Sequence, residues 1–475
     1  MLVNEPESAR RPPRVRSLDV VRGFAVLLMI FVDDAGSAYA VLDHSPWDGL
    51  TIADVVMPFF IFMVGVSAAL ALGGGKRTLA PVLRRGATLW VVGVAVQGGG
   101  LPDPTTYAWG YDLGTVRWCG ILQRIAACYV VASALVLCSP RARRGGGLAT
   151  ADDGVFFGAL ALLVAAYLAM TYLTPVPTYR VGGDEVPCGG IRGALGPRCS
   201  AAGFYDRALF GRAHLYADGA YARLPACSSC APAKCPKASA PAWCAEPGVA
   251  DPEGFLSGVL AVATAVIGAL FARCLERCRA PRPGRDSDDR GGGYARLVDG
   301  DGDRRGALML HWALASLALG AAALVAVAAG SPVNKQLWTP SYCLATAALC
   351  GFALTAAVAL LGDLADGGDD ATFRAARALA EPLRRAGRNA LLLFVLGASG
   401  VLDMCLGAVY VTSGDGRRRN VVDVARDDLF RAHVSGGGTR ANPHARADLL
   451  FSFAVVAFWA AVAWVLDARK IYWTA

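Results

Sequence analysis

Long uninterrupted apolar runs, separated by short polar or arginine-rich stretches, dominate the chain. Each run is long enough to cross roughly 30 Å of hydrocarbon as an α-helix, so the pattern predicts membrane spans. We predict an all-α, polytopic membrane helical bundle of about ten transmembrane helices. The predicted spans are Leu18–Ala35, Leu50–Leu72, Leu79–Val96, Val116–Cys138, Val155–Leu173, Gly254–Phe271, Gly306–Ala328, Pro340–Leu361, Arg388–Tyr410 and Asp448–Leu466.

The composition agrees with this pattern. Of the 475 residues, 55% are hydrophobic and 55 are glycine, and small residues let transmembrane backbones approach closely. We expect residues 1–17 to form a basic cytoplasmic tail and residues 18–475 to form one transmembrane domain. Within that domain, residues 277–305 are rich in Gly, Asp and Arg and are predicted to form a flexible cytoplasmic loop.

The net charge of +8 reflects membrane orientation rather than nucleic-acid binding. Lys and Arg are concentrated in the two terminal segments and in alternate loops, which by the positive-inside rule marks them as cytoplasmic. An even number of spans places both termini on the same side. We therefore expect cytoplasmic termini and no nucleic-acid partner.

The long loop 175–251 falls on the opposite, non-cytoplasmic side and contains six of the 14 cysteines. An even number of cysteines in one non-cytoplasmic loop predicts disulfides, because that compartment is oxidising. The alternative is a zinc site formed by Cys227, Cys230, Cys235 and Cys244.

The hairpin between the first two spans carries the groups that favour chemistry. His44 lies in it, with Asp33 and Asp34 at the end of the preceding span and Asp54 at the start of the next. A carboxylate bonded to one ring nitrogen fixes the tautomer and leaves the other nitrogen free to take a proton. His44 is therefore a candidate general base, with Asp33 and Asp34 as candidate catalytic partners.

Asp19 and Arg22 lie on one face of the first span, near its cytoplasmic end. They form either a structural ion pair or a phosphate-facing arginine. Asp19 and Asp33 are separated by roughly 21 Å along a helix. Only a long, thin ligand would touch both ends of this helix, and coenzyme A has that shape.

Other polar groups fall within or between later spans. Gln123 and Arg124 lie inside the fourth span, and an intramembrane arginine suggests function. Arg124 alternatively neutralises Asp33 or Asp54. Lys335 follows Asn334 on the same side as His44, where it would meet an anionic ligand or hold its loop at the interface.

Eight segments spread along the chain match a known family. They are RSLDVVRG (16–23), HSPWDGLTIADVVMPFF (44–60), GILQR (120–124), CSAAGFYDRALFGRAHLY (199–216), DPEGFL (251–256), SPVNKQLW (331–338), GRNALL (387–392) and RKIYW (469–473). Together they resemble the catalytic domain of the heparan-α-glucosaminide N-acetyltransferase family of transmembrane acyltransferases. The VDDAG stretch at 32–36 is similar to plant members of that family.

The resemblance implies that His44 matches the catalytic histidine of the family. Asp33 stands where the family has an assisting asparagine, and Leu396, Gly397 and Ala398 stand where it has a further histidine. The implied co-substrate is acetyl-CoA. We assign His44, Asp33 and Asp34 as catalytic, no residue as a metal ligand, and as candidate acetyl-CoA-binding residues Asp19, Arg22, Trp47, Asp54, Gln123, Arg124, Asn334 and Lys335.

The leading hypothesis is acetyl transfer from acetyl-CoA to an amino-sugar-like acceptor on the lumenal or extracellular side. A transporter for a small polar solute, lined by Gln123, Arg124 and Asp403, is the first alternative, and a membrane scaffold or sensor is the second. The expected partners are the lipid bilayer and a small-molecule or glycan acceptor, and a homodimer is left open. The expected location is the plasma membrane or a vacuole- or lysosome-like endomembrane.

Overall fold

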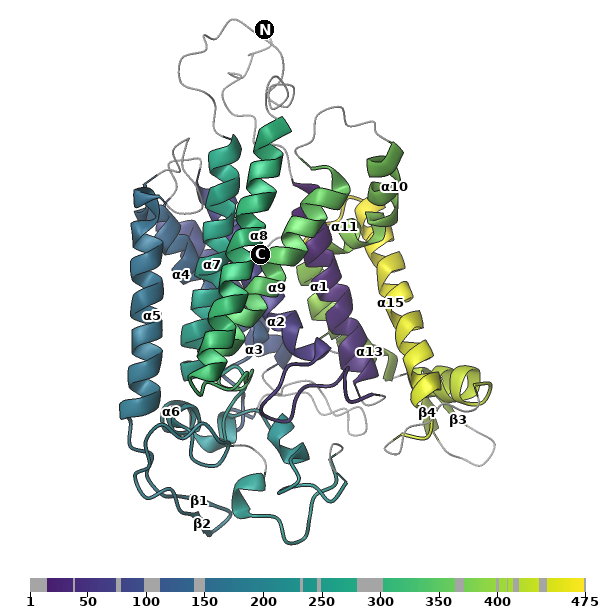
Figure 1. Cartoon of the computed structure of the whole chain (residues 1–475). Helices are drawn as coiled ribbons and strands as arrows, with labels where there is room; N and C mark the ends of the chain where they lie inside the picture. The colour runs from purple at the N-terminus through teal and green to yellow at the C-terminus, as the bar shows by residue number, and fades with distance from the viewer. Residues whose placement is uncertain are drawn as a thin grey trace, which may run out of the picture.

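The computed structural model describes a bundle of long helices with a loop-rich layer at one end (Figure 1). The described residues are 15–36, 39–73, 78–97, 112–140, 150–230, 234–245, 249–279, 302–363, 371–398, 401–407, 409–412, 418–434 and 442–473. The long helices are α1 (Arg16–Ala35), α2 (Ile52–Leu72), α3 (Leu79–Gln97), α4 (Ile121–Cys138), α5 (Gly154–Leu173), α7 (Phe255–Arg279), α8 (Gly302–Ala328), α9 (Pro340–Leu361) and α15 (Ala445–Ala468).

The remaining elements are short. They are helices α6 (Ala201–Phe210), α10 (Ala371–Leu379), α11 (Glu381–Arg388), α12 (Ala390–Leu393), α13 (Val401–Gly407) and α14 (Val421–Val424), with strands β1 (Tyr179–Val181), β2 (Asp184–Val186), β3 (Tyr410–Thr412) and β4 (Arg418–Asn420). The strands form two antiparallel hairpins, β1–β2 and β3–β4.

Nine of the ten predicted spans correspond to single helices, but the count of ten is not confirmed. Among the described residues, eight helices are long and apolar enough to cross a membrane, and α1 is not one of them. Arg16, Asp19, Arg22, Asp33 and Asp34 make α1 more polar than the other long helices. The chain is an integral membrane protein whose first long helix carries charges at both ends.

The predicted span Arg388–Tyr410 is wrong as a single helix. Arg388 ends α11, and the chain then passes through α12, a π-helical turn at Phe394–Ala398 and α13. Glycines weaken a helix, and Gly397 lies at a close contact. A Cβ at Gly397 would lie 2.9 Å from the Trp459 ring of α15. Any residue larger than glycine would therefore collide with this ring unless the ring moved.

Two further expectations are partly outside the described residues. Of the predicted loop 277–305, residues 280–301 are not described, and the flanking residues extend α7 and α8. Of the predicted tail 1–17, residues 1–14 are not described. The Asp403 side chain, proposed for a transporter path, also lies outside the described part.

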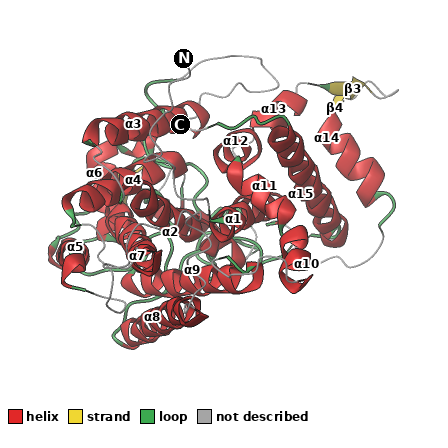
Figure 2. Ribbon diagram, turned by 90° about the horizontal axis from the view of Figure 1, so that it is seen from above, coloured by secondary structure: helices red, strands yellow, loops and turns green. Residues whose placement is uncertain are grey.

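Helix α2 lies in the middle of the bundle, with α1, α4, α7 and α9 around it (Figure 2). Its contact with α7 is a direct backbone contact. A Cβ at Gly65 would lie 1.8 Å from the Ala265 carbonyl oxygen, and one at Gly268 would lie 2.1 Å from the Phe62 carbonyl oxygen. Only glycine permits this approach at either position.

The cysteine-rich loop forms the layer below the bundle in Figure 1, with α6, β1 and β2. The predicted disulfides are confirmed: Cys188 pairs with Cys199, Cys227 with Cys244 and Cys230 with Cys235. These pairs use all four thiols of the alternative zinc site.

Candidate active site

His44 lies in the loop between α1 and α2 and is paired with a buried carboxylate. Its Nδ1 is 2.9 Å from Oδ1 of Asp54, a residue of the first turn of α2 that is 1% exposed. The other oxygen, Oδ2, accepts hydrogen bonds from the backbone N–H groups of Ser45 (3.1 Å) and Thr51 (3.2 Å). Three fixed contacts therefore hold the Asp54 carboxylate against the imidazole.

This pairing determines what the imidazole can do. An ionised carboxylate only accepts hydrogen bonds, so the Nδ1 of His44 must donate to Asp54. The proton of a neutral ring then resides on Nδ1, and Nε2 keeps its lone pair. His44 thus has the arrangement of a general base.

Lys335 brings a cation to the same ring from the loop between α8 and α9. Its Nζ is 3.1 Å from Nδ1 and 3.2 Å from Nε2 of His44, and 3.9 Å from Oδ1 of Asp54. Asn334 fixes this loop, because its amide donates to Asp48 (3.0 Å) and accepts from the Leu337 N–H (2.8 Å). Asn334 is therefore a scaffold for Lys335.

The surroundings lower the pKa of His44 below its ordinary value of 6.5. Burial is the main cause, and the nearby Lys335 ammonium acts in the same direction, while Asp54 opposes both. A lowered pKa keeps the imidazole neutral, and able to accept a proton, at lower pH than an isolated histidine.

The cysteine-rich loop holds the His44 hairpin in place at two points. Arg223 donates to the His44 carbonyl oxygen (2.8 Å) and forms an ion pair with Asp43. The indole N–H of Trp47 donates to the Leu195 carbonyl oxygen (2.8 Å). Trp47, a predicted acetyl-CoA contact, is buried, and its indole N–H is engaged in this contact.

Asp33 and Asp34 end α1 near this site. Within the described residues Asp33 makes no hydrogen bond to the imidazole, and the carboxylate on the ring is that of Asp54. The Asp33 side chain is exposed and lies within electrostatic range of Lys335. Asp34 is half-buried. Asp33 is therefore available to a ligand rather than engaged with His44.

Glu253 adds a further buried carboxylate near His44. It accepts from Arg117 (2.6 Å), which also pairs with Asp251, and it interacts electrostatically with His44. Burial raises the pKa of Glu253, but Arg117, Arg124 and Lys335 outweigh burial, so the net pKa is lowered and the group stays ionised.

Gln123 and Arg124 face the bundle interior from α4, and both are buried. Arg124 donates to the Gly254 carbonyl oxygen (3.2 Å) and to the Ser257 hydroxyl, and its guanidinium lies 5.0 Å from the Trp338 ring centroid. Two other Arg124 nitrogens and both amide atoms of Gln123 lack a partner among the described residues. Such buried polar atoms would be satisfied by a polar ligand.

Asp19 and Arg22 lie at the opposite end of α1, far from His44 along the helix. They form an ion pair, and the Arg22 Nε also donates to the Gly387 carbonyl oxygen (2.6 Å). Arg22 lines an intramembrane cavity of about 160 Å³ between α1, α2, α3, α4 and α12. Arg85, which lies over the Tyr129 ring, lines the same cavity.

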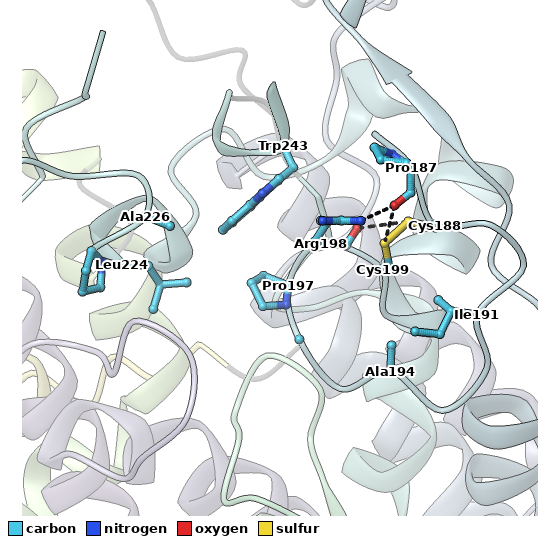
Figure 3. Close-up of a pocket in the computed structure, with 12 residues that line it drawn as sticks. Pro187, Cys188, Ile191, Ala194, Pro197, Arg198, Cys199, Leu224, Ala226 and Trp243 are labelled. Atoms are coloured by element: carbon cyan, nitrogen blue, oxygen red, sulfur yellow. Dashed lines mark hydrogen bonds between the residues drawn. A yellow bond between two sulfur atoms is a disulfide. The ribbon is translucent and has the colours of Figure 1, made fainter. Parts of the chain in front are cut away.

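A second hollow, of about 460 Å³, lies in the cysteine-rich loop (Figure 3). It is almost entirely apolar, with Trp243 on one side and the Cys188–Cys199 disulfide on the other. Its lining includes Ala194 and Leu224, the sequence neighbours of Leu195 and Arg223, which contact the His44 hairpin.

A hydroxyl group supports the first turn of α2. Pro58 lies inside α2 and lacks an N–H, so the carbonyl oxygen of Asp54, four residues earlier, loses its helical partner. The buried Tyr342 hydroxyl donates to that oxygen at 2.6 Å. The carboxylate that orients His44 is thus held at its backbone as well as at its side chain.

Replacing Tyr342 by phenylalanine is expected to lower the free energy of unfolding by about 1–3 kcal/mol, because the Asp54 carbonyl is left buried without a donor. Thermal unfolding of purified protein in detergent would measure this. Tyr172→Phe, at an exposed position, is the matched control. Equal unfolding temperatures for the two variants would contradict this account of α2.

The sequence identifies Lys335 as a candidate on the same side as His44, but it does not predict their direct contact. Four further residues at these sites are not among the candidates that the sequence indicates: Arg85, Arg223, Glu253 and Tyr342. Glu253 lies in the DPEGFL segment at 251–256, which was one available signal. Arg223 is 179 positions from His44, and no local pattern indicates such a contact.

The comparisons with known proteins concern the first part of the chain most directly. Residues 14–181 match the family described as "Heparan-alpha-glucosaminide N-acetyltransferase, catalytic". Human heparan-alpha-glucosaminide N-acetyltransferase (Homo sapiens) is 34% identical over 230 residues, which cover 43% of this chain and 33% of the human protein. The mouse protein of the same name (Mus musculus) is 32% identical over 238 residues, or 45% of this chain and 34% of its own length.

The chain thus spans about a third of the length of the curated relatives that it matches. The family match includes His44 and Asp54, and the α1–α2 pair that carries them. Residues 14–181 are thus similar to the catalytic part of the heparan-α-glucosaminide N-acetyltransferases.

Proposed function

We propose that this protein transfers the acetyl group of acetyl-CoA to a primary amine of an amino-sugar-like acceptor on the non-cytoplasmic side of the membrane. The observation that supports this most directly is the His44–Asp54 pair, in which Nδ1 is committed to the carboxylate and Nε2 is left as a base. The similarity to the human and mouse heparan-alpha-glucosaminide N-acetyltransferases supports the reaction class.

In this mechanism His44 takes a proton from the acceptor's amine as the nitrogen attacks the thioester carbonyl. The C–N bond forms, the C–S bond breaks, and the proton passes to the coenzyme A thiolate. Asp54 stabilises the imidazolium that forms. Asp33, and Asp34 beside it, offer carboxylates that attract a positively charged acceptor.

The donor would lie along the inside of the bundle. Arg22, held by Asp19, and Arg85 offer positive charge to phosphate groups in the intramembrane cavity. Gln123 and Arg124, with unpartnered polar atoms among the described residues, would contact polar parts of the donor nearer to His44. This arrangement uses both ends of α1, as a long and thin ligand requires.

The sidedness follows from the cysteine-rich loop, which contacts the His44 hairpin and carries three disulfides. Disulfides persist in oxidising compartments, so the acceptor side is lumenal or extracellular and both termini are cytoplasmic. A vacuole- or lysosome-like membrane and the plasma membrane both satisfy this requirement.

The test is acetyl transfer by the purified full chain in detergent or lipid vesicles. Isotope-labelled acetyl-CoA is mixed with glucosamine as the amine and glucose as its hydroxyl counterpart, and the products are separated and counted. We expect label on glucosamine and none on glucose. Absence of transfer to either sugar would contradict the proposal, and solute flux without acetyl-CoA turnover would favour the transporter alternative.

Lys335→Met is expected to shift the acid limb of kcat/KM to higher pH. The Lys335 ammonium lowers the pKa of His44, and a base is active above its pKa. Removing the cation raises the pKa of His44, so the pH at which kcat/KM reaches half its maximum is higher in the variant than in the wild type. A pH profile of kcat/KM measures this, with Lys234→Met as the control, and an unchanged acid limb would contradict it.

A further inference from the structure

The Lys335 amine occupies the place beside the base where the proposed reaction needs its nucleophile. Its Nζ is 3.2 Å from Nε2 of His44, the nitrogen that would take the proton of an acceptor amine. The carboxylates that would attract an acceptor ammonium also surround Lys335. Asp54 lies 3.9 Å away, and Asp33 and Glu253 are within electrostatic range.

We propose that Lys335 is a self-acetylation site: when no acceptor is bound, the protein transfers the acetyl group of acetyl-CoA to Nζ of Lys335. This inference rests on the proposed function, because it uses the same donor and the same base. It adds a modification site on the chain itself.

The step balances as an ordinary acyl transfer. The Lys335 ammonium first loses one proton to solvent, which exposes the nitrogen lone pair. That nitrogen attacks the thioester carbonyl carbon, so a C–N bond forms and the C–S bond breaks. His44 accepts the second proton from the nitrogen and passes it to the departing thiolate. The products are N-acetyl-Lys335 and coenzyme A as its free thiol.

The lysines of this chain allow a sharp comparison. There are five: Lys76, Lys234, Lys237, Lys335 and Lys470. Lys335 has a side chain that is 11% exposed, whereas Lys234, at the same end of the molecule, is 35% exposed and pairs with Asp218. Spontaneous chemical acetylation favours accessible amines, so it would label Lys234 before Lys335. Labelling assisted by His44 reverses that order.

Self-acetylation also has a functional consequence. It neutralises the Lys335 cation and leaves a bulkier amide beside Nε2, where the acceptor must approach. An enzyme incubated with the donor alone is therefore expected to start acceptor transfer more slowly than an enzyme that received donor and acceptor together.

The experiment incubates the full-length purified protein with isotope-labelled acetyl-CoA and no acceptor, then measures the label on each lysine by peptide mass spectrometry. We expect Lys335 to be labelled at least tenfold faster than Lys234. His44→Ala is expected to reduce Lys335 labelling about 10²-fold, the lower range for loss of a general base. Lys234 labelling should stay unchanged.

A second measurement uses only the wild-type protein, in case the alanine variant does not fold. Excess glucosamine should suppress Lys335 labelling and leave Lys234 labelling unaltered, because only Lys335 shares the acceptor position. Lys335 labelling that equals that of Lys234, or that persists in folded His44→Ala, would overturn the inference. Transfer to glucosamine without label on Lys335 would overturn only the self-acetylation of Lys335. If neither glucosamine nor Lys335 were labelled, the proposed function would be overturned as well.

Discussion

Replacing His44 by alanine is expected to lower kcat for acetyl transfer to an amine by about 10²–10⁴-fold, the usual contribution of a general base. The imidazole Nε2 keeps a lone pair because Nδ1 is bonded to Asp54, and this nitrogen lies 3.2 Å from the Lys335 amine that marks the acceptor position. Without the imidazole, the acceptor amine has no positioned base to take its proton as the nitrogen attacks the thioester. Initial rates with labelled acetyl-CoA, at saturating donor, measure the effect.

His214→Ala is the matched control for this variant. His214 also lies at the non-cytoplasmic end, where its Nδ1 contacts the Val116 carbonyl oxygen at 2.7 Å, but it is no part of the site around Asp54. We expect its kcat to stay within a fewfold of wild type. Full activity of folded His44→Ala would remove the general-base mechanism.

Replacing Asp54 by asparagine is expected to lower kcat by about 10³–10⁴-fold, although the side chain keeps its size. The amide oxygen of the new side chain would remain with the Ser45 and Thr51 N–H groups, which need an acceptor. The amide NH₂ group would then face Nδ1 of His44 and donate to it. The ring proton moves to Nε2, and the nitrogen that must accept a proton becomes a donor.

Two readouts separate this tautomer effect from damage to the fold. Asp48→Asn changes a carboxylate in the same hairpin that contacts Asn334 rather than His44, and we expect it to keep most of the activity. Thermal unfolding of Asp54→Asn should stay close to wild type if only the proton has moved. Activity of Asp54→Asn within tenfold of wild type, in folded protein, would contradict the assigned tautomer.

Hydropathy predicted most of the membrane helices because a span must satisfy its own backbone hydrogen bonds and present apolar side chains to lipid. Nine long helices follow the predicted spans, with ends displaced by a few residues. The segment after Arg388 was mispredicted, because hydropathy does not register the close contact at Gly397 that accompanies the break. The apolar pattern there is real, but the backbone is irregular.

The site was only partly predictable. His44 and its acidic neighbours could be identified from sequence, and Thr51 three residues before Asp54 is a helix-capping pattern that places this carboxylate at the start of α2. The contact between Lys335 and His44 joins residues 291 positions apart, and no local pattern encodes it. The SPVNKQLW resemblance at 331–338 indicated that this loop matters without indicating where it folds.

The glycine contact between α2 and α7 has a consequence for how the site beside His44 can open. Where two helices touch backbone to backbone at Gly65 and Gly268, no layer of side chains remains to slide or rotate, so the pair moves as one rigid unit. One member of that unit holds Asp54 and the other begins beside Glu253. Rocking of these two helices against each other, the motion by which carriers expose a site alternately to each face, is therefore blocked, and any opening of the site must come from helices outside this pair.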